Sequence, residues 1–377
     1  MEETATIFSD ETALRDFIHG RGHGVKGLAD RAVPKVPQKY VRPPHERIVE
    51  HARRGPTPPH LYDQLHQPIS LKALLDGSDD DREVVVDKIV RAAEALGYFQ
   101  VVDHGVPIEL LEAVKCSIHE FFQQRAEEKL VHSTGKIATY RTSYVSEKEP
   151  VWDWRDSLTL SYTNDAEAME NWPTVCKEIM LEYMKASSKM SATLVEALLG
   201  KLGGTVDERR FEGLTGHKVV HMNYYPPCPN PELTTGTRCH SDKSLITALL
   251  QDRVGGLSVK AATDVYGVKK GDWIDVPPVE GALVINVGDV MQILSNGRYK
   301  SPEHRVRTSR NSSRISVAVF TNPVMSENIG PLPQTITEAN GVAFYREFVY
   351  KDYLVNYVTT VHTGKRPLDF AEIDNHA

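Results

Sequence analysis

From about residue 216 onward the chain consists of short apolar runs separated by turn-forming residues, and this pattern constrains the fold more than any other feature. The runs are rich in Val, Ile, Leu and Tyr, whereas Gly, Pro, Asn and Asp fill the gaps between them. The runs include KVVHMNYY, SLITALLQD, GLSVKAA, DWIDVPP, GALVINVGD, MQILSN, HRVRT and RISVAVFTN. Many short strands at such spacing are typical of an all-β sandwich or barrel, of which the jelly roll is one form.

The part of the chain before these runs is predicted to be largely helical. Apolar residues recur at helical spacing over 83–96, and Gly97 follows as a C-cap. The next residues, YFQVV, indicate a strand over 98–102. Pro107 opens a second helix, and a third is predicted over about 173–202. We therefore expect helices packed around a C-terminal β-barrel.

The predicted organisation has four parts. Residues 1–65 are rich in Pro, His and Arg, a composition that buries little on its own and favours an arm lying over the main body. A helical region is expected over 66–205 and the jelly-roll domain over 216–325. A C-terminal extension then covers 326–377.

Charge and composition argue against several classes of protein. The formal net charge is −7 and the pI is about 6.1, so nothing indicates binding to nucleic acid or to an anionic membrane. Four cysteines without a CxxC pair indicate neither a disulfide framework nor a zinc ribbon. The N-terminus lacks the apolar stretch of a secretory signal, and no apolar run approaches the length of a membrane span. We expect a cytoplasmic monomer.

A histidine and an aspartate two residues apart, His240 and Asp242, stand just before the apolar run SLITALLQD. In a strand, residues i and i+2 point to the same face, so this imidazole and this carboxylate can converge on one ion. His304, at the head of another predicted strand, is the candidate third ligand. Two histidines and one carboxylate on one face of a metal leave three positions open, as in the facial triad of non-haem Fe(II) oxygenases.

Other interpretations of these three residues stay open at this point. A zinc hydrolase also uses two histidines and one carboxylate. A lone His304 is typical of a surface or hydrogen-bonded histidine, and a non-catalytic β-barrel binding protein needs no metal. These alternatives differ in what else the site must contain.

Two further same-face pairs indicate what binds beside the metal. Arg314 and Ser316 lie two apart in RISVAVF, and Asn223 and Tyr225 lie two apart in HMNYY. An arginine among aliphatic residues is expensive to bury unless it holds an anion, and its planar fork suits a carboxylate. The alternative is an edge-strand arginine in water. A dicarboxylate with an α-keto group would bind the metal at one end and the arginine at the other, which describes 2-oxoglutarate.

These residues resemble those of the plant soluble 2-oxoglutarate/Fe(II)-dependent dioxygenase family. The matching pieces, in the family's order, are GYFQVVDHGVP, NYYPPCPNPELTTG, HSD, LLQDRVGGLSV, VINVGDVMQILSNGRYKSPEHRV and RISVAVF. The resemblance extends from about Gly24 to about Ile373, although Asp103 stands where the family usually has Asn. It implies an α+β fold whose core is a double-stranded β-helix, a distorted jelly roll.

The resemblance also implies roles for individual residues. It assigns Fe(II) to His240, Asp242 and His304, the distal carboxylate of 2-oxoglutarate to Arg314 and Ser316, and supporting contacts to Asn223 and Tyr225. Phe320 falls where relatives stack an aromatic substrate, and His221 stands where the family often carries a lysine. Dioxygen is the second cosubstrate, and ascorbate is the reductant.

Three segments, at the two ends and in the middle of the chain, narrow the range of candidate substrates. GHGVKGLADRAVPKVPQKYVRPPHER, TNDAEAMENWPTVCKEIMLEYMKASSKM and KDYLVNYVTTVHTGKRPLDFAEI resemble the feruloyl-CoA and p-coumaroyl-CoA ortho-hydroxylases of coumarin biosynthesis. Scopoletin, a flavonoid, a benzoxazinoid or an indole such as melatonin is the alternative substrate. Tyr140 and Arg141 are expected to line the pocket. Arg141, Arg155 and Lys26 are candidates for contacts with the phosphates of CoA, although solvated surface charges explain them equally well.

Overall fold

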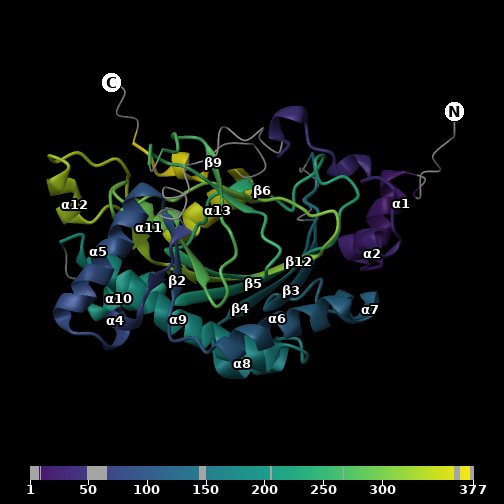
Figure 1. Ribbon diagram of the computed structural model, residues 1–377, viewed down its shortest axis with the longest axis horizontal. Coiled ribbons are helices and arrows are strands. Elements are labelled where there is room, and N and C mark those ends of the chain that lie inside the picture. Colours follow the sequence, from purple (N-terminus) through teal and green to yellow (C-terminus); the bar gives the residue numbers. More distant parts are fainter. Residues whose placement is uncertain are drawn as a thin grey trace.

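The computed structural model describes residue 8 and residues 10–48, 66–143, 150–203, 206–265, 267–360 and 366–373. Two β-sheets face each other, and a layer of helices covers the outer face of the larger one (Figure 1). Within these described residues, no helix is both long enough and apolar enough to cross a membrane.

The larger sheet has eight strands in the order β1-β2-β10-β7-β12-β5-β4-β3. Along the chain these are β1 (Ile69–Ser70), β2 (Tyr98–Val102), β3 (Ala138–Thr142), β4 (Asp156–Tyr162), β5 (His217–Tyr225), β7 (Ile246–Gln251), β10 (Leu283–Val287) and β12 (Arg314–Asn322). All neighbours are antiparallel except β1 and β2. Because side chains alternate along a strand, one face of this sheet packs on helices and the other faces the smaller sheet.

The smaller sheet has the order β6-β11-β8-β9. Its strands are β6 (Thr237–His240), β8 (Leu257–Lys260), β9 (Trp273–Asp275) and β11 (His304–Val306). The two sheets bury one shared apolar cluster, which includes Leu257, Val259 and Val306 from the smaller sheet and Tyr225, Leu249 and Ala318 from the larger. This is the jelly-roll core that the short apolar runs predicted.

One predicted strand was wrong. The run MQILSN lies mostly in helix α11 (Asp289–Leu294). Nearly every residue of this helix is buried, and the run is too short for periodicity to distinguish a buried helix from a strand.

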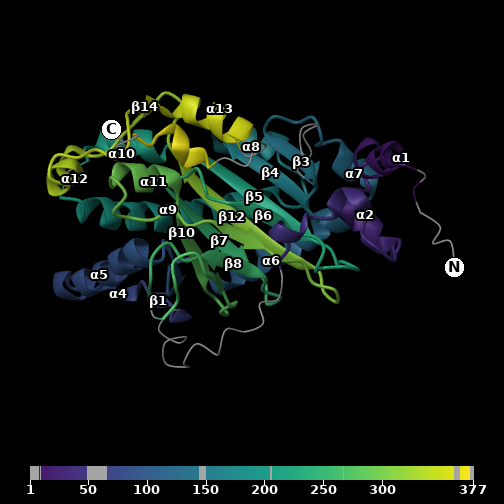
Figure 2. The same ribbon diagram turned by 90° about the horizontal axis from the view of Figure 1, so that it is seen from above.

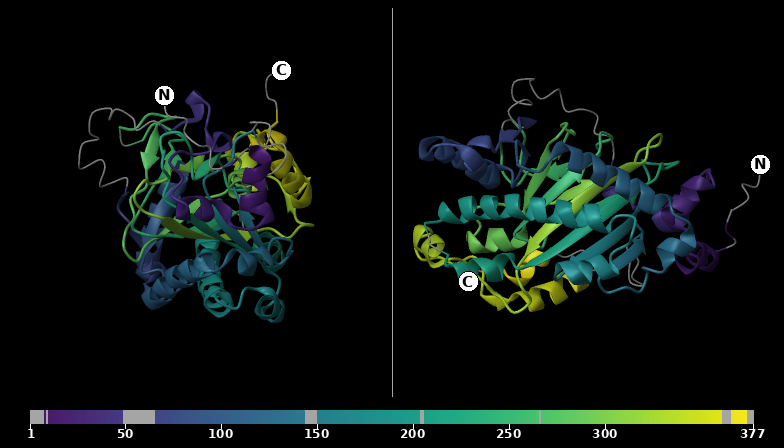
Figure 3. Two further views of the ribbon diagram at one scale, coloured as in Figure 1. Left: turned by 90° about the vertical axis from the view of Figure 1, so that its right-hand side faces the viewer. Right: turned by 90° about the horizontal axis from the view of Figure 1, so that it is seen from below.

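Helices cover the outer face of the larger sheet, and the long helix α9 (Lys177–Gly200) packs on β5, β7 and β12 (Figure 3). The others in this part of the chain are α4 (Lys72–Asp76), α5 (Asp79–Ala95), α6 (Ile108–Gln123), α7 (Ala126–Leu130), α8 (Asp165–Asn171) and α10 (Glu208–Thr215). Buried residues recur along α9 at helical spacing, among them Met180, Met184 and Leu198.

The predicted strand over 98–102 is confirmed as β2, and the three predicted helices are α5, α6 and α9. Helix α5 begins four residues before the predicted start because the hydroxyl of Ser78 accepts a hydrogen bond from the backbone N–H of Asp81 at 3.3 Å and caps it. Gly97 then ends the helical turn in the left-handed conformation, with φ at 72°.

Residues 10–48 form a separate group of short helices at the β3 end of the molecule (Figure 2). They are α1 (Glu11–Arg15), the π-helical turn η1 (Asp16–Gly20), α2 (Gly24–Asp30) and the 3₁₀ turns η2 (Gln38–Tyr40) and η3 (Pro44–Glu46). Their apolar side chains bury against Trp152 and Trp154 of the main body. The rest of the predicted arm, residues 1–7, 9 and 49–65, lies outside the described residues.

The carboxylate of Asp156 joins this arm to the larger sheet. It accepts hydrogen bonds from the backbone N–H groups of Val25 at 2.8 Å and Lys26 at 2.9 Å, in the first turn of α2. Burial raises the pKa of Asp156, and the charge of Lys129 and these donors oppose that rise. A buried carboxylate is favourable here because a helix N-terminus presents unpaired N–H groups and partial positive charge.

After β12 the chain returns to the jelly roll. This segment comprises β13 (Asn328–Ile329), α12 (Pro333–Glu338), β14 (Phe348–Val349), α13 (Tyr350–Thr360) and η4 (Pro367–Phe370). On α13 the hydroxyl of Tyr353 donates to the carboxylate of Asp289 at 2.6 Å, and that of Tyr357 donates to the carbonyl of Ser241 at 2.8 Å. Helix α13 therefore rests on the loop between His240 and Asp242.

The junction at Asp156 gives a test of how tightly the arm is attached. Gly24 has φ at 69°, and a Cβ there would lie 2.5 Å from Tyr140 Oη and 2.6 Å from both carboxylate oxygens of Asp156. We expect Gly24→Ala to lower the free energy of unfolding by about 2–4 kcal/mol, from overpacking and left-handed strain together. Chemical denaturation measures this.

The matched control is Gly271→Ala, where φ is 90° but a Cβ would meet nothing within 4 Å. It carries the backbone strain alone, so a loss of about 1–2 kcal/mol is expected. Equal losses in the two variants would show that the contact between the arm and Asp156 is not tightly packed.

Candidate metal centre and adjoining anion site

Strands β6 and β11 bring two histidines together. His240 and His304 are direct partners in this antiparallel pair, and their ring centroids lie 4.2 Å apart. Asp242, two residues beyond His240, turns its Oδ1 toward both rings. This oxygen lies 3.8 Å from His240 Nε2 and 3.7 Å from His304 Nε2. One ligand atom from each residue therefore faces a common point.

Hydrogen bonds on the far side of each ligand fix this orientation. Nδ1 of His240 lies 3.0 Å from the carbonyl of Arg238, and Nδ1 of His304 lies 3.2 Å from the carbonyl of Pro302. A carbonyl only accepts, so each Nδ1 carries the proton and each Nε2 keeps a free lone pair. Oδ2 of Asp242 accepts from the hydroxyl of Thr247 at 2.7 Å, which leaves Oδ1 for an ion.

Burial and the charge of the neighbouring His304 together lower the pKa of His240 to about 4, against the opposing charge of Asp242. The ring is therefore neutral at physiological pH, the form in which an imidazole binds a metal.

A second buried carboxylate, Asp289, supports the metal-binding loops from behind. It accepts hydrogen bonds from Ser241 at 3.1 Å, Ser301 at 2.7 Å and Tyr353 at 2.6 Å. Its backbone N–H donates to the carbonyl of Asp242 at 2.7 Å. Burial raises the pKa of Asp289 to about 6. Because Ser241 and Ser301 belong to the two loops that carry the ligands, Asp289 ties these loops together.

Arg314 lies at the start of β12 with only 2% of its surface exposed. Its Nη1 donates to Ser316 Oγ at 3.2 Å and its Nη2 to Gln251 Oε1 at 3.1 Å, while the buried Nε has no partner. The ring of Tyr225 lies 5.1 Å from the guanidinium carbon. Among the described residues this cation has no carboxylate partner, so its burial is favourable only if an anion binds beside it.

Strand register places the other predicted residues on the same face. Tyr225 is the direct partner of Arg314, and Asn223 is the direct partner of Ser316. The hydroxyl of Tyr225 lies 3.0 Å from that of Thr237 on β6, which connects this face to the strand of His240. Phe320, half-buried, continues the face of Ser316 along β12.

The side chains of Tyr140 and Arg141 point to opposite sides of the larger sheet. They are neighbours on β3, where successive side chains face opposite sides of the sheet. Arg141 pairs with Ser157, which pairs with Asn223, so Arg141 points to the side of the metal cluster. Tyr140 points the other way and packs near Phe121, with ring centroids 6.2 Å apart. The structure therefore does not bring Tyr140 to the predicted site.

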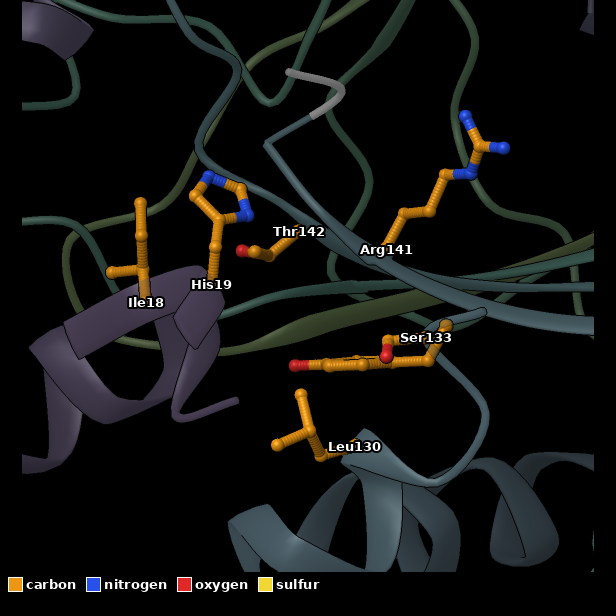
Figure 4. Close-up of a pocket in the computed structure, with 7 residues that line it drawn as sticks. Ile18, His19, Leu130, Ser133, Arg141 and Thr142 are labelled. Atoms are coloured by element: carbon orange, nitrogen blue, oxygen red, sulfur yellow. The ribbon is translucent and has the colours of Figure 1, made fainter. Parts of the chain in front are cut away.

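Both residues also line a cavity of about 220 Å³ at the edge of the sheet, between the arm and α7 (Figure 4). The other lining residues are Ile18, His19, Leu130, Ser133 and Thr142. This cavity contains none of the metal-cluster residues, so it is distinct from the site around His240.

The three basic residues considered for phosphate contacts do not form one patch. Lys26 pairs with Asp30 at 2.7 Å, and Arg141 is exposed on β3. Arg155 is buried and donates from Nη1 to Asn223 Oδ1 and Thr237 Oγ1, both at 3.2 Å. The sequence left Arg155 open between a phosphate contact and a solvated surface charge, and its place directly after Trp152, Asp153 and Trp154 was the available signal that it is inside.

Sequence comparison matches two parts of the chain to models of dioxygenase families. The model of the 2OG-Fe(II) oxygenase superfamily matches residues 216–323, and that of the non-haem dioxygenase in morphine synthesis N-terminal region matches residues 68–178. Scopoletin 8-hydroxylase of Arabidopsis thaliana is 46% identical over 371 residues, 97% of this chain and 99% of its own length. A feruloyl CoA ortho-hydroxylase of Ipomoea batatas is 41% identical over 375 residues, 98% of this chain and 99% of its own length.

Solved structures agree on the fold. JOX2, crystallised in complex with 2OG, Fe and JA, superposes with a TM-score of 0.73 at 30% identity, covering 88% of this chain and 92% of its own. The rice dioxygenase for auxin oxidation superposes with a TM-score of 0.66 at 23% identity, covering 79% and 96%. The second likeness concerns the fold alone.

The geometry of the histidine pair predicts the effect of removing one ligand. We expect His304→Ala to weaken Mn(II) binding more than 100-fold, because even the loss of a group that only supports a ligand weakens metal binding about 10–100-fold. Calorimetry under nitrogen measures this. His45→Ala, with a side chain that is 79% exposed, is the control. Metal affinity retained in His304→Ala would remove His304 from the ligand set.

The lowered pKa of His240 predicts how the metal-free protein responds to acid. Below about pH 6.5 the unfolded chain protonates this histidine, whereas the folded chain resists protonation until about pH 4. The free energy of unfolding should therefore fall as pH drops through this interval, with His240 contributing about 1–2 kcal/mol of the loss.

Urea titrations of the metal-free wild type and His240→Gln, at pH 7 and pH 4.5, test this contribution. We expect the variant to lose less stability on acidification than the wild type. Parallel losses in both proteins would mean that His240 titrates normally in the folded chain.

Proposed function

The chain belongs to the 2OG-Fe(II) oxygenase superfamily, and from this premise we propose that it hydroxylates the aromatic ring of a phenolic plant metabolite on the coumarin route. The protein is an oxidoreductase that uses ferrous iron and 2-oxoglutarate, with ascorbate as the typical reductant. The zinc hydrolase and the non-catalytic binding protein considered from the sequence are not favoured.

The donor set around Asp242 fits ferrous iron. Two imidazoles with free Nε2 lone pairs and one carboxylate oxygen face one point, which is the two-histidine, one-carboxylate arrangement of this metal in oxygenases. We assign His240, Asp242 and His304 as the iron ligands. When bound, the iron and 2-oxoglutarate supply the oxidising power for inserting an oxygen atom of dioxygen into a C–H bond.

The buried guanidinium of Arg314 is the observation that carries the assignment of 2-oxoglutarate to this site. It lacks a carboxylate partner among the described residues and shares a strand face with Ser316, Asn223 and Tyr225. A carboxylate bound here by two guanidinium N–H groups and the hydroxyl of Ser316 would point the rest of a short diacid toward the metal ligands. Asn223 and Tyr225 would flank it.

The substrate class rests on the relatives. Feruloyl CoA ortho-hydroxylases and scopoletin 8-hydroxylase align with nearly the whole of this chain. We propose ortho-hydroxylation of feruloyl-CoA or p-coumaroyl-CoA as the first candidate reaction. The higher identity to scopoletin 8-hydroxylase makes a free coumarin the second. Phe320 would pack on the aromatic ring and Arg141 would face the pocket. A monomeric state and a cytoplasmic location are further proposals.

The substrate assignment is tested by product analysis. The purified protein, with Fe(II), ascorbate and 2-oxoglutarate, should form succinate together with a substrate gaining one oxygen when it receives feruloyl-CoA, p-coumaroyl-CoA or scopoletin. Mass spectrometry identifies the product. Turnover of a flavonoid or an indole, with none of these three, would reject the coumarin route while leaving the oxygenase assignment intact.

The assignment of Arg314 predicts a specific loss. Arg314→Gln should weaken 2-oxoglutarate binding by about 10–100-fold, the usual value of a hydrogen-bonded charge. The 2-oxoglutarate affinity of Arg314→Lys should lie between those of Arg314→Gln and the wild type, because lysine keeps the charge but lacks the planar pair of N–H donors.

Calorimetry with Mn(II) measures both Arg314 variants. Arg253→Gln is the control, since Arg253 is exposed and pairs with the exposed Glu280. Unchanged 2-oxoglutarate affinity in Arg314→Gln would place the cosubstrate elsewhere.

A further inference from the structure

A second buried arginine stands beside the metal centre, and neither the metal nor 2-oxoglutarate accounts for it. Arg155 immediately precedes β4 and is 8% exposed. Its Nη1 donates to Asn223 and Thr237, both neutral, and its buried Nε has no partner. Thr237 lies on β6, the strand that ends at His240.

The acid nearest to Arg155 in the sequence is already occupied. Asp153 is buried, and its carboxylate pairs with Arg42 and with Arg238, the latter at 3.3 Å. Three arginines thus surround one aspartate, and the described residues provide Arg155 with no ion pair of its own. A cation without an anion is costly to bury, so this charge indicates a bound anion.

A buried histidine, His221, and a further cation, Lys243, lie near Arg155. His221 is two residues before Asn223 on β5 and shares its face, with its ring centroid 6.4 Å from that of Phe320. Burial holds the pKa of His221 well below its usual range, and the charges of Arg155 and Lys243 lower it further. Lys243 has no carboxylate partner among the described residues, and its ammonium lies 5.5 Å from the ring of Tyr357.

We propose that Arg155 binds an oxyanion carried by the aromatic substrate, with Lys243 adding a second positive charge nearby. The inference rests on the proposed function and extends it, because it requires a negative charge on the aromatic part of the substrate: a phenolate in a CoA ester or a coumarin, or a carboxylate in a free aromatic acid. Arg155 is separate from Arg314, which lies at the other end of the Asn223–Tyr225 strand segment. Its partner Thr237 lies on the strand that ends at His240, whereas a long pantetheine arm separates the phosphates of a CoA ester from the ring.

Binding measurements on charged and neutral ligand pairs test the proposal. One pair is ferulate and methyl ferulate, whose charge is a carboxylate. The other is scopoletin, at a pH where its phenol is ionised, and its methyl ether. Dissociation constants are measured by calorimetry under nitrogen with Mn(II) and saturating 2-oxoglutarate, so that no turnover is needed.

In the wild type, at least one anion should bind more tightly than its neutral counterpart, and the pair that shows this identifies carboxylate or phenolate. Arg155→Gln should weaken that anion about 10–100-fold and its neutral counterpart less than about twofold. Arg155→Lys should recover part of the loss, and Arg91→Gln, at an exposed arginine of α5, should change nothing. The affinity for 2-oxoglutarate, measured in parallel because Arg155 donates to Asn223, should fall less than the affinity for that anion.

Three results would overturn the inference. The first is a wild type that binds neither anion better than its neutral counterpart. The second is an Arg155→Gln variant that weakens the charged and neutral ligands equally, which would indicate a structural role. The third is a loss of 2-oxoglutarate affinity alone, which would make Arg155 a cosubstrate residue. None of these depends on whether hydroxylated product forms, so they are distinct from failure of the proposed function.

Discussion

The pairing register of two antiparallel strand pairs is the constraint on which the site depends. In the smaller sheet it sets His240 opposite His304, and in the larger sheet it sets Arg314 opposite Tyr225. Side chains alternate along a strand, so a slip of one residue in either pair would turn the functional groups to the opposite face. The apolar residues between them are buried in the shared core, and burial of those residues holds the register.

Charge in the interior is organised around molecules that the chain must bind. The proposed iron ligands are two imidazoles and one carboxylate, whereas Arg314 and Arg155 are buried cations without ion pairs among the described residues. Burying such cations opposes folding, and bound anions offset that cost. Asp289 has a different role, because its partners are hydroxyl groups that fix the loops carrying the ligands.

The sequence predicted what depends on short-range spacing. Strand periodicity placed Arg314 with Ser316 on a common face, and β2 matched its predicted bounds. His240 and Asp242 do come together, although Asp242 lies just beyond the end of β6 rather than in a strand. The same alternation shows why Tyr140 and Arg141 cannot both face the side of the sheet that carries the metal cluster, since adjacent strand residues point in opposite directions. Arg155 could not be placed, because its contacts lie 68 and 82 residues away along the chain.

The segment Trp152–Asp156 connects the arm with the face of the larger sheet that carries the metal cluster. Trp152 and Trp154 form the surface on which the arm packs, and Asp156 caps α2, while Asp153 pairs with Arg42 of the arm and Arg155 faces the metal side. Five consecutive residues thus serve two regions at once. Chimaeras that exchange only the jelly roll between relatives would leave Arg155 with its original parent, so a transplant of the proposed specificity has to include the segment 152–156.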